Sequence, residues 1–157
     1  MNYIIREILK EEYNLLEDFL YEAIFVPEGI SGPPKSIIGQ PELRVYLTDF
    51  GKKKDDIGFV AEVDTKVVGV VWVRIMNDYG HINDVTPSLA ISLYKEYRGL
   101  GIGTALMKKM LLLLREKGYA QTSLAVQKEN YAVKMYKDVG FYIVDENSEE
   151  YIMICDL

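Results

Sequence analysis

Three alternate glycines, Gly99, Gly101 and Gly103, lie between an apolar stretch and a long helical pattern. Because glycine has no Cβ, such a loop can adopt positive φ angles and let a ligand approach the backbone closely. The first N–H groups of the following helix have no acceptor inside the helix, and the helix dipole places partial positive charge there. The sequence therefore predicts a phosphate-binding loop, beside which Arg98 adds a positive charge.

The spacing of these glycines distinguishes between known kinds of phosphate loop. A Walker loop ends in Gly-Lys-Ser/Thr, whereas Thr104 and Ala105 follow the third glycine here. A dinucleotide-binding loop has the spacing G-x-G-x-x-G near the start of a βαβ unit, whereas G-x-G-x-G lies here roughly two thirds of the way along the chain. A turn whose glycines only reverse the chain is the alternative without a ligand.

Length and charge narrow the class of protein. The 157 residues fit one domain, residues 1–157, and the net charge of −6 argues against a nucleic-acid partner, which Lys and Arg would have to neutralise. The single Cys155 excludes an internal disulfide, and no residue cluster indicates a metal site. No apolar run has the length of a membrane span, and the charged N-terminus is unlike a secretory signal. We therefore expect a cytoplasmic protein with no membrane partner.

Hydrophobic periodicity and turn residues predict eleven elements along the chain. The expected strands are residues 3–8, 58–63, 67–76, 89–94, 120–126, 141–144 and 151–155. The expected helices are residues 11–25, 41–50, 102–117 and 130–139. A glycine- and proline-rich loop, residues 26–40, is interpreted as functional. This order indicates an α/β (α+β) fold with one mixed sheet of about seven strands flanked by about four helices.

Two stretches carry a resemblance to a known family. Residues 98–103, RGLGIG, resemble the R/Q-x-x-G-x-G/A signature of the GCN5-related N-acetyltransferases (GNAT). Residues 123–141 resemble the second signature of that family, with Asn130 opening a helix, Tyr136 following and Gly140-Phe141 beginning the next strand. The resemblance covers the C-terminal half closely and the N-terminal half by element order, and it implies a mostly antiparallel GNAT-like sheet.

The resemblance implies acetyl-CoA as co-substrate, with no metal. In the family the glycine loop holds the pyrophosphate, and the preceding strand splays from the next so that its backbone pairs with the pantetheine arm. Carried over, the cofactor-binding residues are Ile91, Ser92, Leu93, Arg98, Gly99, Leu100, Gly101, Ile102, Gly103, Thr104, Asn130 and Tyr136. An amide near Leu93 would polarise the thioester carbonyl, an effect worth on the order of 3 kcal/mol.

By the same resemblance, Tyr136 is the catalytic acid. Acetyl transfer from a thioester expels a thiolate, and a phenol with a pKa of about 10 can donate the proton that the thiolate needs. The alternative is an aromatic side chain that only packs on the inner face of its helix. Asn130 can act both as an N-cap and, by the resemblance, as a contact near the pantetheine arm.

The base that takes a proton from the attacking amine stays open. The candidates are Asp84, His81, Glu62, Glu28 and an ordered water chain. Ser88 stands where relatives often have an acidic residue, which leaves the base without an obvious position.

We expect an acetyl-CoA-dependent N-acetyltransferase that acetylates a primary amine of a small molecule or peptide by direct attack in a ternary complex. The acceptor pocket would be formed by the first two helices, residues 26–40 and the strand near Asp84. The alternative is a non-catalytic acyl-CoA sensor of the same fold, and a third is a structural module. The acceptor, the use of other acyl-CoAs and the oligomeric state, including a homodimer, are not decided by the sequence.

Overall fold

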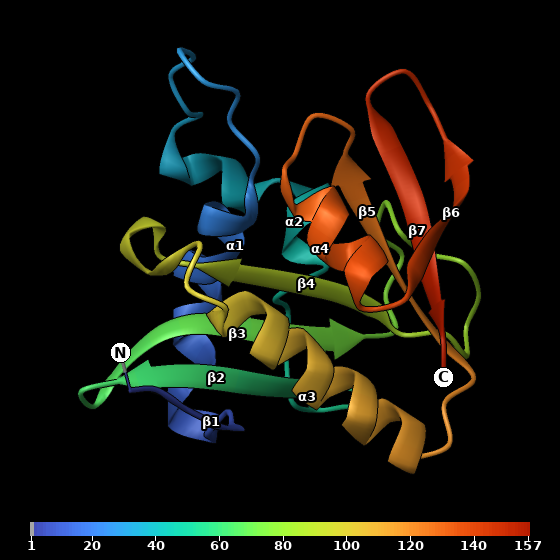
Figure 1. Ribbon diagram of the computed structural model, residues 1–157, viewed down its shortest axis with the longest axis horizontal. Coiled ribbons are helices and arrows are strands. Elements are labelled where there is room, and N and C mark those ends of the chain that lie inside the picture. Colours follow the sequence, from blue (N-terminus) through green and yellow to red (C-terminus); the bar gives the residue numbers. More distant parts are fainter. Residues whose placement is uncertain (1) are drawn as a thin grey trace.

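The computed structural model describes residues 2–157, which contain one seven-stranded sheet (Figure 1). Its strands are β1 (Ile4–Glu7), β2 (Ile57–Val63), β3 (Lys66–Arg74), β4 (Ser88–Leu93), β5 (Gln121–Gln127), β6 (Phe141–Glu146) and β7 (Glu150–Asp156). They are arranged in the order β1-β2-β3-β4-β5-β7-β6, and only β4 and β5 run parallel. The predicted mixed, mostly antiparallel sheet is confirmed.

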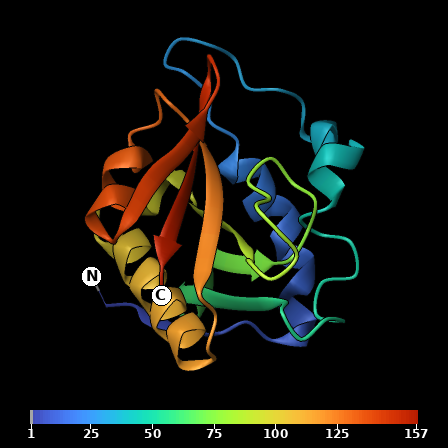
Figure 2. The ribbon, with the colours of Figure 1, turned by 90° about the vertical axis from the view of Figure 1, so that its right-hand side faces the viewer.

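Helices cover both faces of the sheet (Figures 1 and 2). The α-helices are α1 (Leu16–Ala23), α2 (Pro41–Arg44), α3 (Ile102–Glu116) and α4 (Ala132–Asp138). Three 3₁₀ helices are η1 (Lys10–Leu15), η2 (Lys35–Gly39) and η3 (Lys95–Tyr97). The helices α3 and α4 pack on one face, and α1 and η2 pack on the other.

The strand β3 is buried on both sides, as its nearly continuous run of β-branched residues predicts. Val71 and Val73 pack in the core beneath α3, whereas Val70 and Trp72 pack in the core beneath α1. Because successive side chains of a strand point to opposite faces, this one strand serves both cores.

The predicted helix 11–25 is too long at its N-terminal end. It begins as the 3₁₀ helix η1, and regular α-helix starts only at Leu16. The Glu12 carboxylate accepts a hydrogen bond from the Leu9 amide at 2.9 Å and is held by Arg6 at 2.8 Å. This local capping keeps the first turn tight and orients Glu12 toward β1.

The predicted helix 41–50 is also wrong in length, because α2 ends at Arg44. Beyond it, the Thr48 hydroxyl donates to the Arg44 carbonyl at 2.9 Å. Arg74 donates to the carbonyls of Val45 and Thr48 at 3.1 and 2.9 Å. Arg74 takes the carbonyls of Val45 and Thr48, and Asp49 adopts a positive φ of +56°, so the segment after α2 continues as turns.

Candidate active site

The strands β4 and β5 form a fork. They are paired at Ser88 and Ser123, and the following residues of the two strands separate. On its other side β4 pairs with β3 along its whole length. The fork therefore leaves one edge of β4 facing a gap inside the sheet.

The register of β3 and β4 determines which backbone groups face this gap. The Tyr94 amide donates to the Val68 carbonyl at 3.0 Å. Because antiparallel strands alternate between hydrogen-bonded and non-bonded pairs, Ser92 also bonds to β3, whereas Ile91 and Leu93 point their N–H and C=O groups into the gap. A bound extended chain could pair with these two residues as an added strand.

The main-chain contact expected at Ser92 is not offered by this arrangement. Its backbone is directed to β3, and its hydroxyl donates to the Phe19 carbonyl of α1 at 2.5 Å. Ser92 still lines the cleft described below, but it serves to hold α1 on β4.

The glycine loop leads from η3 into α3 with unusual backbone angles. Gly99 has φ +75° and Gly101 has φ +87°, and a Cβ at either position would meet no atom within 4 Å. These glycines are therefore required by conformation rather than by lack of space. Gly103 differs, because its Cβ would lie 3.3 Å from Leu93 and 3.5 Å from Met135.

The N-terminus of α3 presents a row of amides. The first helical hydrogen bond runs from the Ala105 amide to the Gly101 carbonyl at 3.1 Å. The N–H groups of Ile102, Gly103 and Thr104 therefore have no acceptor within the helix. Together with the helix dipole they can hold an anion, which is the role that the motif predicts for them. The side chain of Ile102 lies in the core, so this residue can contribute only its backbone. Leu100 is half exposed, and neither residue is among those that line the cleft described below.

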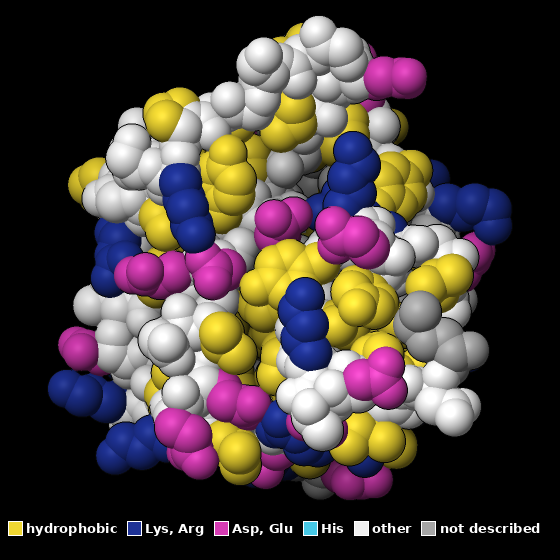
Figure 3. All heavy atoms as spheres, turned by 90° about the vertical axis from the view of Figure 1, so that its left-hand side faces the viewer, with side chains coloured by type: hydrophobic (Ala, Val, Ile, Leu, Met, Phe, Trp, Pro, Cys, Tyr) yellow, Lys and Arg dark blue, Asp and Glu magenta, His cyan; other side chains and the backbone are white. Residues whose placement is uncertain are grey.

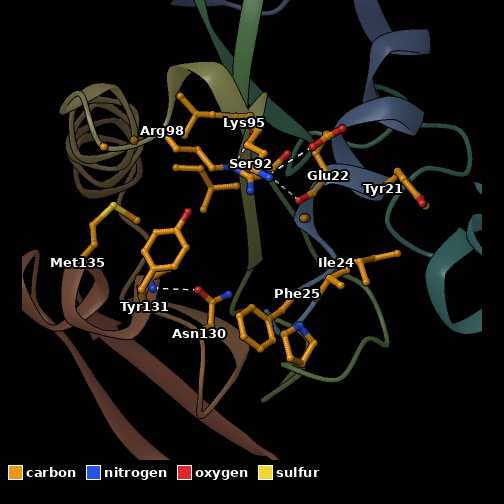
Figure 4. Close-up of a pocket in the computed structure, with 18 of the residues that line it drawn as sticks. Tyr21, Glu22, Ile24, Phe25, Ser92, Lys95, Arg98, Asn130, Tyr131 and Met135 are labelled. Atoms are coloured by element: carbon orange, nitrogen blue, oxygen red, sulfur yellow. Dashed lines mark hydrogen bonds and ion pairs between the residues drawn. The ribbon is translucent and has the colours of Figure 1, made fainter. Parts of the chain in front are cut away.

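A cleft of about 690 Å³ joins the gap, the loop and α4 (Figure 4). Its lining includes the predicted residues Ile91, Ser92, Leu93, Arg98, Gly99, Gly101, Gly103, Thr104, Asn130 and Tyr136. The opposite wall is the end of α1 and residues 24–30, part of the loop interpreted as functional. The predicted cofactor residues from three separate segments thus meet at one place.

Tyr136 lies on α4 and is only 8% exposed. Burial raises the pKa of its phenol well above the ordinary value of 10, because a phenolate would lose its hydration. Its ring packs against Phe141, with 6.0 Å between the ring centroids. The phenol is therefore protonated at neutral pH, and Tyr136 is among the residues that line the cleft.

Asn130 precedes α4 and organises its start. Its carboxamide oxygen accepts a hydrogen bond from the Ala132 amide at 2.9 Å. Because Tyr131 already has helical angles, Asn130 stands directly before the helical backbone and caps it, as the sequence predicts. Asn130 also lines the cleft, so the residue that caps α4 through its carboxamide oxygen lies at the site as well.

Of the four side chains considered as the base, Glu28 lines the cleft. His81 and Asp84 contact each other at 3.5 Å in the loop between β3 and β4, and neither is among the lining residues. Glu62 is paired with Arg6 at 3.1 Å on β2. The cleft instead contains Glu22 and Lys95, which sequence reasoning missed because nothing in their local pattern distinguishes them from a solvated surface.

Arg98 is engaged within the protein. Its Nε donates to the Leu93 carbonyl at 3.1 Å, and its Nη2 donates to the carbonyl and carboxylate of Glu22 at 3.2 and 3.3 Å. On the face that carries η3, basic and acidic side chains are interspersed (Figure 3). An anion in this cleft would therefore depend on local donors rather than on a broad positive field.

No group of three or more His, Cys, Asp or Glu side chains in residues 2–157 could hold a metal ion. No helix between residues 2 and 157 is long and apolar enough to cross a membrane.

Comparison with known sequences gives consistent matches. The acetyltransferase (GNAT) family model matches residues 10–141. An N-alpha-acetyltransferase of Sulfurisphaera tokodaii is 36% identical over 105 residues, covering 61% of this chain and 62% of that protein. An uncharacterised N-acetyltransferase of Methanocaldococcus jannaschii is 32% identical over 146 residues, covering 88% of this chain and 60% of that protein. The chain thus spans about 60% of the length of these curated relatives.

Solved structures share the fold. The PaiA N-acetyltransferase from Thermoplasma acidophilum, crystallised with coenzyme A, aligns over all of both chains with a TM-score of 0.73 and 20% identity. A GNAT acetyltransferase from Streptococcus pneumoniae aligns over 99% of this chain and 100% of that one, with a TM-score of 0.73 and 21% identity. Since the family model matches most of the sequence, from residue 10 to residue 141, the chain belongs to the acetyltransferase (GNAT) family.

Proposed function

We propose that this protein transfers an acetyl group from acetyl-CoA to a primary amine of a small molecule or peptide, by direct attack in a ternary complex. One observation carries the proposal: a single cleft is lined by the open edge of β4, by the start of α3 with its amides, and by Tyr136 of α4. The names of the relatives, which are N-acetyltransferases, support the same class of reaction.

The cleft suits the chemical groups of acetyl-CoA. The amides of Ile102, Gly103 and Thr104 are unpaired within α3 and match a diphosphate. The outward-facing backbone of Ile91 and Leu93 matches the amides of a pantetheine arm, which would pair as an added strand. The Leu93 carbonyl already accepts from Arg98, so its N–H is the group that remains for the ligand.

The proposed reaction needs three protein functions. The amine nitrogen forms a bond to the thioester carbon, and the carbonyl oxygen becomes an oxyanion that a backbone N–H such as that of Leu93 stabilises. The C–S bond then breaks, and the sulfur takes its proton from the Tyr136 hydroxyl. Before the attack the ammonium loses one proton to water or to Glu28, the base candidate that lines the cleft, and after the attack the nitrogen loses a second proton to solvent. Solvent returns the proton to Tyr136.

The acceptor would enter against residues 24–30 and the end of α1, which form the wall opposite β4. This is narrower than the acceptor pocket predicted from sequence, since α2 and Asp84 are not among the lining residues. The proposal keeps a cytoplasmic location and a single catalytic domain, residues 1–157, as predictions.

The experiment is a measurement of free thiol released from acetyl-CoA across a panel of small amines and peptides. We expect release that depends on the amine and is strongly reduced in Tyr136→Phe, with Tyr142→Phe as a control on exposed β6. Tight binding of acetyl-CoA without turnover on any amine would favour the sensor function. Absence of acetyl-CoA binding would overturn both.

A further inference from the structure

Two cations line the cleft, Lys95 and Arg98. The glycine signature predicts that Arg98 faces the phosphates, since it stands directly before the loop. In the structure, however, the three hydrogen bonds of Arg98 go to Leu93 and Glu22, as Figure 4 shows for the side chains.

Arg98 caps the C-terminal end of α1, although it lies 76 residues away in the sequence. Glu22 lies in the last turn of α1, where carbonyls have no amide donor from the helix. The guanidinium satisfies this carbonyl, compensates the Glu22 carboxylate and bonds to the end of β4 at once. A lysine could not do this, because its ammonium lacks the planar fork of donors.

A second hydrogen bond joins the same two elements. The Ser92 hydroxyl of β4 donates to the Phe19 carbonyl of α1 at 2.5 Å. The hydrogen bonds to Phe19 and Glu22 hold the C-terminal half of α1 against the end of β4. Because α1 leads directly into residues 24–30, they also fix the wall that faces β4 across the cleft.

Lys95 is in a different situation. Its side chain is exposed at the start of η3, between β4 and the glycine loop. The lysines that form ion pairs in residues 2–157 are Lys35, Lys52, Lys128 and Lys134, and Lys95 is not one of them. Its charge is therefore not compensated within the described chain, and its flexible stem can follow a mobile phosphate.

We propose that the two cations have separate duties. Arg98, held by Glu22, is a positioning residue that fixes residues 24–30 against β4, and Lys95 is the cation that meets the phosphate groups of acetyl-CoA. The inference rests on the proposed function, because it names the ligand of that same cleft.

The test compares four variants by calorimetric titration with acetyl-CoA at low and high salt, and by amine kinetics at saturating acetyl-CoA. Lys95→Gln should weaken acetyl-CoA binding several-fold and flatten its salt dependence, because an exposed charge is screened by salt. Lys108→Gln, on an exposed position of α3, should change neither. Arg98→Lys should raise the KM for the amine several-fold while leaving the salt dependence of acetyl-CoA binding unchanged.

Glu22→Gln separates the two possible duties of Arg98. If Arg98 turned to the phosphates, removing the Glu22 charge would release it and tighten acetyl-CoA binding. The proposal instead expects no tightening and a raised KM for the amine. Tighter binding in Glu22→Gln, equal effects of Lys95→Gln and Lys108→Gln, or an unchanged amine KM in Arg98→Lys would each overturn it.

Hydrogen exchange in the free protein tests the positioning role of Arg98 independently of the proposed function. The Ile24 amide donates to the Tyr21 carbonyl at 3.1 Å at the end of α1. In the free protein, Arg98→Lys and Glu22→Gln should speed hydrogen exchange at this amide, because the end of α1 is released. Unchanged exchange would refute the positioning role of Arg98. A wild-type protein that binds no acetyl-CoA would refute the proposed function instead.

Discussion

The side chain on which the proposed chemistry depends is Tyr136. It is 8% exposed and lies at the wall of the cleft, where burial raises the pKa of the phenol. A buried phenol is a weaker acid than a free one, but it is fully protonated at neutral pH, and Tyr136 lines the cleft proposed to hold acetyl-CoA. Position and protonation state therefore suit proton donation better than nucleophilic attack.

Replacing Tyr136 by Phe removes the donor and keeps the ring in its contact with Phe141. We expect kcat to fall about 100-fold, the lower range for loss of a general acid, and the KM for acetyl-CoA to change little. Steady-state kinetics on the same amine measure both. A kcat within about two-fold of wild type would mean that another group protonates the sulfur.

The pH dependence follows from the direction of the same shift. Because burial moves the deprotonation of Tyr136 above the ordinary value of about 10, this acid stays competent throughout the neutral and mildly alkaline range. We expect kcat to show no falling limb up to about pH 10. A loss of kcat between pH 7 and 9 that disappears in Tyr136→Phe would contradict the assignment.

The loop glycines make a matched pair of variants possible. Gly101 and Gly118 flank α3 with φ +87° and +89°, and a Cβ would meet no atom within 4 Å at either position. Valine should therefore cost similar stability at both, about 1–3 kcal/mol of backbone strain. Gly101→Val should also abolish acetyl-CoA binding, and Gly118→Val should not. Equal affinities in isothermal titration would place the phosphate cradle elsewhere.

Local spacing could predict some of these residues and not others. The glycines and Tyr136 belong to short motifs, so their roles can be predicted from residues close to them in the sequence. Glu22 could not be found, because its role comes from Arg98, and nothing near either residue signals a contact across 76 positions. The same contact changes the expectation for Arg98 itself.

At the scale of elements, the fork between β4 and β5 positions the site. Periodicity predicts both strands, and the resemblance to the family predicts their separation. The alternation of bonded and free amides along β4 depends on its register with β3, which the sequence does not specify. The sequence predicts the helices 11–25 and 41–50 too long for two different reasons. Glu12, held by the neighbouring Arg6, caps a 3₁₀ turn locally, whereas Arg74 of the distant strand β3 takes the Val45 and Thr48 carbonyls.

Hydrogen exchange tests the fork directly. In the free protein the amides of Ile91 and Leu93 face the gap, whereas those of Ala90 and Ser92 bond to β3. We expect the first pair to exchange faster than the second, and to become protected when acetyl-CoA is added. Equal protection of all four amides before and after addition would contradict the strand-like pairing of the ligand.

For the molecule as a whole, three buried or partly buried tyrosines influence stability at alkaline pH. Burial is the main cause that raises the pKa of Tyr46, Tyr136 and Tyr119, the last to about 12. In the unfolded chain these phenols ionise near their ordinary pKa of about 10, so the unfolded state loses protons first. Their contribution to stability is therefore complete below about pH 10 and is lost as the pH rises further.

We accordingly expect the free energy of unfolding in urea to fall from about pH 10 to about pH 11. Tyr46→Phe should make this fall less steep, although it also removes the hydrogen bond to Asp78 at 2.9 Å and lowers stability at neutral pH. The comparison is therefore of slopes. A slope that is the same in wild type and variant would show that Tyr46 ionises as easily in the folded protein as in the unfolded chain.

In the proposed complex one ligand spans three elements of the molecule: its diphosphate lies at the start of α3, its pantetheine arm along β4 and its thioester near Tyr136. A crystal structure with acetyl-CoA tests this placement most directly. We predict the diphosphate within hydrogen-bond distance of the amides of residues 102–104, and the arm paired with Ile91 and Leu93. Acetyl-CoA bound outside the β4–β5 gap, or with its diphosphate away from these amides, would contradict the account.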